Sequence, residues 1–104
     1  MTMIEYFNKL FKQNNWDSVD SKQWHKIHKG TYQIYDALIV LVDDLFVFDL
    51  MIKNQNHIIT KELEKFVPLA DPTSLDEIEK YAKMSIVDWQ DAGMKAYWEY
   101  HGPR

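Results

Sequence analysis

The chain has 104 residues, the size of one domain, and we expect residues 1–104 to form a single folded unit. Apolar residues make up 46 % of the sequence and cysteine is absent, which favours a globular cytoplasmic domain and excludes disulfide bonds and cysteine metal sites. The net charge of −4, without a strong basic region, argues against nucleic acid as a direct partner.

The first 30 residues predict two N-terminal helices. Thr2 and Glu5 have the spacing of a capping box, and apolar residues then recur at helical spacing to about Lys12. After a polar connector, residues 21–29 read as a second, short helix, which Gly30 would end as its C-terminal cap.

Residues 31–60 predict a small antiparallel sheet, because β-branched and aromatic residues dominate this stretch. We expect strands over 32–42 and 45–53, with Asp43 and Asp44 as a two-residue hairpin loop, and a third short strand over residues 57–60. The competing interpretation makes residues 31–53 one long buried helix. We favour strands, because the aspartates would fall on more than one face of such a helix.

The predicted hairpin loop determines which residues share a face. Val42 would face Leu45, and one face of the hairpin becomes wholly apolar, so that it must pack on helices. That face comprises Tyr35, Ala37, Ile39, Leu41, Phe46, Phe48, Leu50 and Ile52. The other face has an apolar centre with Asp36, Asp49 and Lys53 at its rim, and we expect it to be half covered.

The remaining residues predict C-terminal helices, so the fold class is α+β. We expect a brief helix over 61–67, then a helix over 74–84 that begins with a capping box at Ser74 and Glu77. A last helix over 86–100 would end at Gly102.

Helical spacing divides the aromatic residues of this last segment into two stripes. One stripe contains Trp89, Gly93, Tyr97 and Tyr100, and the other contains Val87, Met94, Trp98 and His101. A helix that packs on a sheet needs only one buried face, so the second stripe would be free to bind a partner. The alternative is that the sheet and a neighbouring helix bury both stripes.

The function that these features favour is binding of another protein. No catalytic motif is present, so we expect an inhibitor, immunity or antitoxin-like protein. Lysine greatly outnumbers arginine, which suggests that the source is a low-GC bacterium or its phage. The candidate partner-binding residues are Trp98, Met94, His101, Tyr100, Asp43 and Asp44. The acidic loop favours a partner with a basic surface, and a second copy of this chain is the other partner considered.

The alternative function is a small metal-dependent hydrolase or nuclease. In the predicted hairpin Asp36 and Asp49 are diagonal neighbours, a placement in which two carboxylates can share a proton or bind a metal ion. We favour the simpler interpretation, in which Lys53 neutralises them. We therefore expect no catalytic residue, metal ion or cofactor, and no membrane span, because aspartates interrupt the longest apolar run.

Overall fold

The computed structural model describes residues 2–99 and shows an α+β arrangement of an N-terminal helix, a six-stranded antiparallel sheet and a later helix. The strands lie side by side in sequence order, so each pairs with its neighbours along the chain. The elements are α1 (Met3–Gln13), β1 (Asp17–Asp20), β2 (Gln23–Lys29), β3 (Ile34–Val42), β4 (Leu45–Lys53), β5 (Ile59–Pro68), α2 (Ser74–Lys83), the 3-10 helix η1 (Ile86–Asp91) and β6 (Lys95–Glu99).

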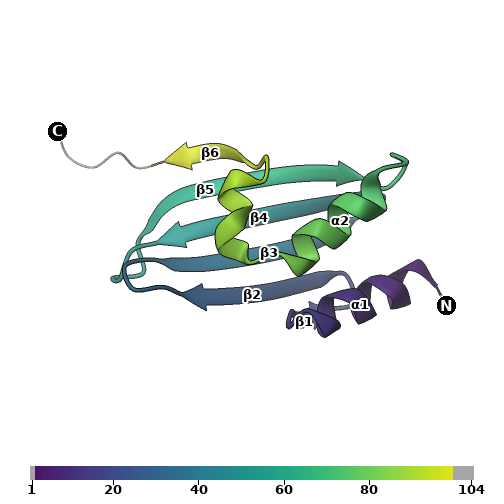
Figure 1. Ribbon diagram of the computed structural model, residues 1–104, viewed down its shortest axis with the longest axis horizontal. Helices are drawn as coiled ribbons and strands as arrows, with labels where there is room; N and C mark the ends of the chain where they lie inside the picture. The colour runs from purple at the N-terminus through teal and green to yellow at the C-terminus, as the bar shows by residue number, and fades with distance from the viewer. Residues whose placement is uncertain (1, 100–104) are drawn as a thin grey trace.

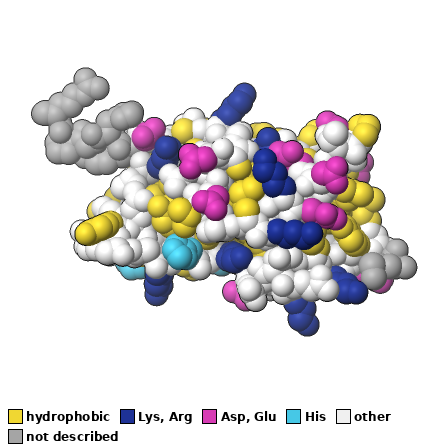
Figure 2. Space-filling view, viewed as in Figure 1, with side chains coloured by type: hydrophobic (Ala, Val, Ile, Leu, Met, Phe, Trp, Pro, Cys, Tyr) yellow, Lys and Arg dark blue, Asp and Glu magenta, His cyan; other side chains and the backbone are white. Residues whose placement is uncertain are grey.

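All three helical segments cover the same face of the sheet (Figure 1). The core lies between them and that face, and it is rich in aromatic side chains. Its fully buried members include Phe7, Phe11, Phe46, Phe48, Ile78, Tyr81 and Trp89. Seen from the helix-covered side, the surface carries acidic and basic side chains interspersed with one another (Figure 2), as on an ordinary solvated face.

The predicted hairpin is confirmed, including its register. Val42 pairs with Leu45, and the pairing continues to Ile34 opposite Lys53. Asp43 in the loop has φ of 54°, a conformation that aspartate tolerates better than most residues. All eight residues of the predicted apolar face are buried, at 0 to 9 % exposure, because this face packs on the helices. The long-helix interpretation of residues 31–53 is wrong.

The first predicted helix is confirmed and the second is wrong. Helix α1 begins after Thr2, whose Oγ1 accepts a hydrogen bond of 3.2 Å from the Glu5 N–H. Residues 21–29 instead contain strand β2, which pairs with β3 along its length. Only Trp24 of this strand is buried, and its other apolar residue, Ile27, points to the opposite face, so the sequence shows no regular apolar alternation.

The C-terminal prediction is correct for one helix only. Helix α2 matches the expected segment, but Ser74 lies inside it and donates its hydroxyl proton to the carbonyl of Pro68 instead of capping. The brief helix expected over 61–67 is part of β5, and the expected last helix divides into η1 and β6. Gly93 separates these two elements with φ of +95°, which favours glycine and cannot continue a helix. The sheet thus extends well beyond residues 31–60.

No helix among residues 2–99 combines the length and the apolar character that crossing a bilayer requires.

Candidate functional site: the open face of the sheet

The face of the sheet opposite the helices has no cover among the described residues. Strand pairing determines its members, because directly paired residues of antiparallel strands point to the same side. We call this surface the open face. It comprises Gln23, His25, Ile27, Lys29, Ile34, Asp36, Leu38, Val40, Val42, Leu45, Val47, Asp49, Met51, Lys53, Ile59, Glu62, Glu64, Phe66, Pro68, Lys95 and Trp98.

Large apolar side chains are exposed across the open face. Ile27 is 50 % exposed, Val42 and Phe66 are each 52 % exposed, and Trp98 is 44 % exposed. They come from four different strands and surround apolar neighbours that are half-buried. A sheet face with this composition is typical of a surface that another molecule covers.

Four carboxylates lie in two adjacent rows across the centre of this face. In one row Met51 pairs with Asp36 on one side and with Glu62 on the other. In the next row Asp49 pairs directly with Glu64. The sheet therefore holds four acidic side chains close together among apolar neighbours.

Asp36 is neutralised within the protein. Its Oδ2 lies 3.0 Å from Nζ of Lys53, and its Oδ1 lies 2.5 Å from Nε2 of His25. The predicted pairing of Lys53 with this aspartate is confirmed, whereas Lys53 makes no such contact with Asp49.

Asp49 is the unusual member of the group. Its Oδ1 is buried and has no hydrogen-bond partner among the described residues. Burial raises the pKa of its carboxyl from 3.8 to about 6, and the negative charges of Glu62, Glu64 and Asp36 add to this shift. Because a buried, unpartnered carboxylate is unfavourable, a cation placed beside Asp49 would stabilise it.

The geometry gives little support to metal-assisted catalysis. Asp36 and Asp49 are diagonal neighbours on the open face, as predicted, but Asp36 is already engaged by Lys53 and His25. Among residues 2–99, no group of three histidine or acidic side chains has the spacing of a metal site.

The predicted partner-binding residues do not form one site. Asp43 and Asp44 are exposed in the turn between β3 and β4, and Trp98 lies on the open face in β6. Met94 is only 8 % exposed and belongs to the core, so the stripe that joined it to Trp98 does not exist. Tyr100 and His101 lie outside the described residues.

The sequence interpretation missed Ile27, Phe66, Glu62 and Glu64, because it placed their segments in helices. A weak signal was present in the alternation of acidic and apolar residues at Glu62, Leu63 and Glu64, which is a strand pattern. Glutamate and lysine favour helices, and this preference concealed the alternation.

Comparisons with known proteins give no family: no family model, curated protein or solved structure matches the chain.

Proposed function

We propose that the chain is a small protein-binding module that sequesters a partner protein on the open face of its sheet. Among such modules we favour the inhibitor, immunity or antitoxin-like proteins of low-GC bacteria and their phages. The lysine-rich, cysteine-free composition supports this class, and the open face supports the binding role.

The observation that carries the proposal is the apolar character of the uncovered face. Exposed Ile27, Val42, Phe66 and Trp98 surround half-buried aliphatic side chains, while the apolar side chains of the opposite face pack against the helices. Protein interfaces concentrate aromatic residues in an apolar centre, and a few such residues contribute most of the binding free energy. Covering these side chains would remove their apolar surface from water.

The partner's chemistry follows from the carboxylates on this face. Within the described part of the chain, Asp49, Glu62 and Glu64 make no ion pair, and Oδ1 of Asp49 receives no hydrogen bond. We propose that the partner inserts a lysine or arginine side chain at Asp49 and packs apolar side chains around it. Such complementarity speeds association and selects the partner.

The hydrolase alternative has less support. It would use Asp36 and Asp49, but the described residues offer these two aspartates no third metal ligand at suitable spacing. The His25 and Lys53 contacts of Asp36 would also have to break before it could bind a metal ion.

Truncating an exposed aromatic residue of the open face is expected to weaken partner binding and leave the fold intact. We predict that Trp98→Ala and Phe66→Ala each reduce affinity by about 30-fold, equivalent to about 2 kcal/mol. Leu75→Ala is the matched control, since Leu75 is 47 % exposed but belongs to α2. Its affinity should match that of the unaltered chain.

The measurement begins with proteins that the immobilised chain retains from lysate of its source organism. Mass spectrometry then identifies the proteins that bind the unaltered chain and the Leu75 variant but do not bind the open-face variants. Calorimetry with the purified partner then gives the affinities, and thermal unfolding checks each variant's fold. A partner that loses affinity for the Leu75 variant alone would place the interface on the helix-covered side.

A further inference from the structure

Strand β5 continues past the end of its partner β6. Strand β6 pairs with residues 61–64 of β5, whereas β5 pairs with β4 as far as Pro68. Alternate residues of an antiparallel strand direct their N–H and C=O groups to opposite neighbours. Leu69 donates its N–H at 2.8 Å to the carbonyl of Asp44, the turn residue just before β4. By alternation Phe66 directs its N–H and C=O away from β4, toward the free edge.

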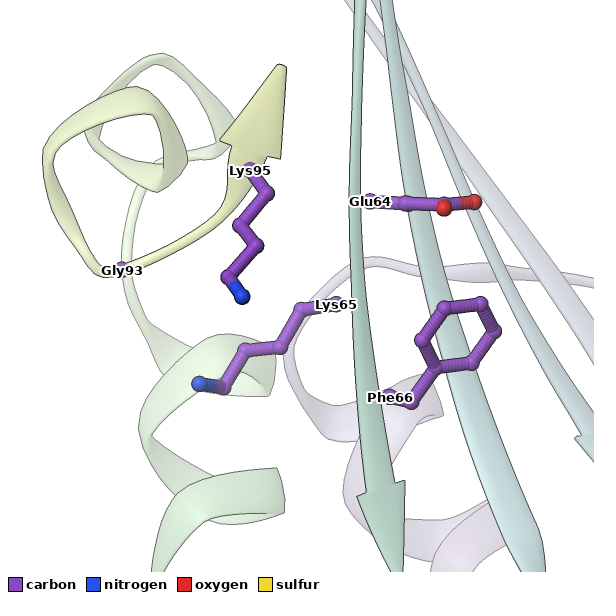
Figure 3. A pocket seen from close by; sticks show the side chains of 5 residues that line it. All are labelled: Glu64, Lys65, Phe66, Gly93 and Lys95. Atoms are coloured by element: carbon purple, nitrogen blue, oxygen red, sulfur yellow. The ribbon is translucent and has the colours of Figure 1, made fainter. Parts of the chain in front are cut away.

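Gly93 explains why the Phe66 backbone is left unpaired. The pairing of Glu64 with Lys95 would place Gly93 opposite Phe66 if β6 began two residues earlier. Instead, the φ of +95° at Gly93 turns the chain away toward η1. A hollow of about 240 Å³ remains between the two segments (Figure 3).

The unpaired edge is short and bounded. A second hollow of about 180 Å³ continues along β5 to the start of α2. The carbonyl of Pro68 already accepts hydrogen bonds from the Ser74 hydroxyl and from the Asp71 N–H, at 3.3 Å for the latter. Because β6 and the start of α2 bound the unpaired edge, only a short stretch of polypeptide, such as the end of a chain, fits beside Phe66.

Two lysines and one glutamate, Lys65, Lys95 and Glu64, line the first hollow. Figure 3 shows Lys95 extending from β6 toward the side chain of Lys65. Nζ of Lys65 lies 3.2 Å from Glu77, while Lys95 makes no ion pair with any described residue. The free charge of Lys95 beside an unpaired backbone amide is complementary to a carboxylate.

We propose that the free edge of β5 at Phe66 binds the C-terminal end of an extended polypeptide. The N–H and C=O of Phe66 form two backbone hydrogen bonds with it, as in other peptides that add a strand to a sheet edge. Lys95, which makes no ion pair with a described residue, neutralises the terminal carboxylate. This site shares Phe66 and Lys95 with the open face, but its hydrogen bonds use the backbone edge of β5, and it does not rest on the function proposed for that face.

The test is a nuclear magnetic resonance titration of the isotope-labelled chain with the peptide acetyl-Thr-Val-Ile-Val bearing a free carboxylate. The expected shifts centre on the amides of residues 65, 66, 93 and 95, with saturation at peptide concentrations of about 1 mM. The same peptide with an amidated C-terminus should bind about tenfold more weakly, since its terminal charge is removed. Equal binding of both forms would overturn the role of Lys95.

Variants at Phe66 separate the backbone from the side chain. Phe66→Pro removes an N–H that the β4 ladder does not use, and proline is tolerated at such edge positions. Binding should fall about tenfold in Phe66→Pro relative to Phe66→Ala, which also lacks the aromatic ring but retains the N–H. If Phe66→Pro does not fold, a peptide N-methylated at its penultimate residue tests the same hydrogen bonds on the unaltered chain. Shifts that are scattered over the surface, or undiminished affinity in these tests, would overturn the proposal.

Discussion

Replacing Trp89 by alanine is expected to lower the free energy of unfolding by about 3–5 kcal/mol. Trp89 is fully buried, and its ring packs on Trp16 and Tyr81 with centroid distances of 5.4 Å to each. Its Nε1 also donates a hydrogen bond of 3.0 Å to the Tyr81 carbonyl. Truncation would therefore leave a cavity and an unpaired buried carbonyl together.

This loss is a large part of the stability of a domain of this size, which is about 5–15 kcal/mol. Urea unfolding followed by circular dichroism measures it directly. Trp98→Ala is the internal control, since it truncates the same residue type at an exposed position and should cost far less. A similar, small loss in both variants would show that η1 does not pack on the sheet as described.

Replacing Asp49 by asparagine is expected to abolish tight partner binding and to stabilise the free protein. The partner's cation would lose its carboxylate, which typically costs about 2–5 kcal/mol of binding free energy for a buried charge pair. In the free protein the same change removes a carboxylate whose Oδ1 is buried with no hydrogen-bond partner among residues 2–99. Because Asp49 is partly open to water, which screens the repulsion, we expect a gain of about 1–2 kcal/mol at pH 7.

The pKa of Asp49 gives this stabilisation a defined pH dependence. The folded protein holds the proton more tightly than the unfolded chain, since the pKa is about 6 in the fold against 3.8 ordinarily. Its contribution to stability therefore falls as the pH rises from about 4 to 6 and stays low above that range. The Asp49→Asn variant should not lose stability in this way. Its free energy of unfolding should therefore come to exceed that of the unaltered chain as the pH rises from about 4 to 6.

Unfolding at a series of pH values measures the difference between the unaltered chain and the variant. Asp44→Asn, in the exposed turn, is the matched control and should show no such advantage. A variant that is less stable than the unaltered chain at pH 7 would mean that the Asp49 carboxylate is satisfied in the free protein.

The sequence predicted the central hairpin well because its two faces differ so clearly. Alternating residues from Tyr35 to Ile52 are buried on one side, and a one-residue slip would have exposed all of them. A two-residue loop at Asp43 and Asp44 allows only one pairing of the two strands. That pairing places Asp36 and Asp49 on the second face, as the structure shows.

The outer strands could not be predicted in the same way because their neighbours determine their conformation. Residues 61–67 contain strong helix formers, yet they pair with β4 and bury Leu63 and Val67. Strand β6 pairs with β5 despite a sequence that also suits an aromatic helix. Trp98 was predicted to be an exposed partner-binding residue. Its neighbours on the open face were missed, because they belong to a strand that was predicted to be a helix.

The most direct test of the central claim is site-specific photo-crosslinking to the partner. A photoreactive phenylalanine derivative replaces Val47, near the centre of the open face, or Leu75, on the helix-covered side. Our account predicts that the partner cross-links efficiently from position 47 and not from position 75. Cross-linking from position 75 alone would contradict the claim that the open face is the binding surface.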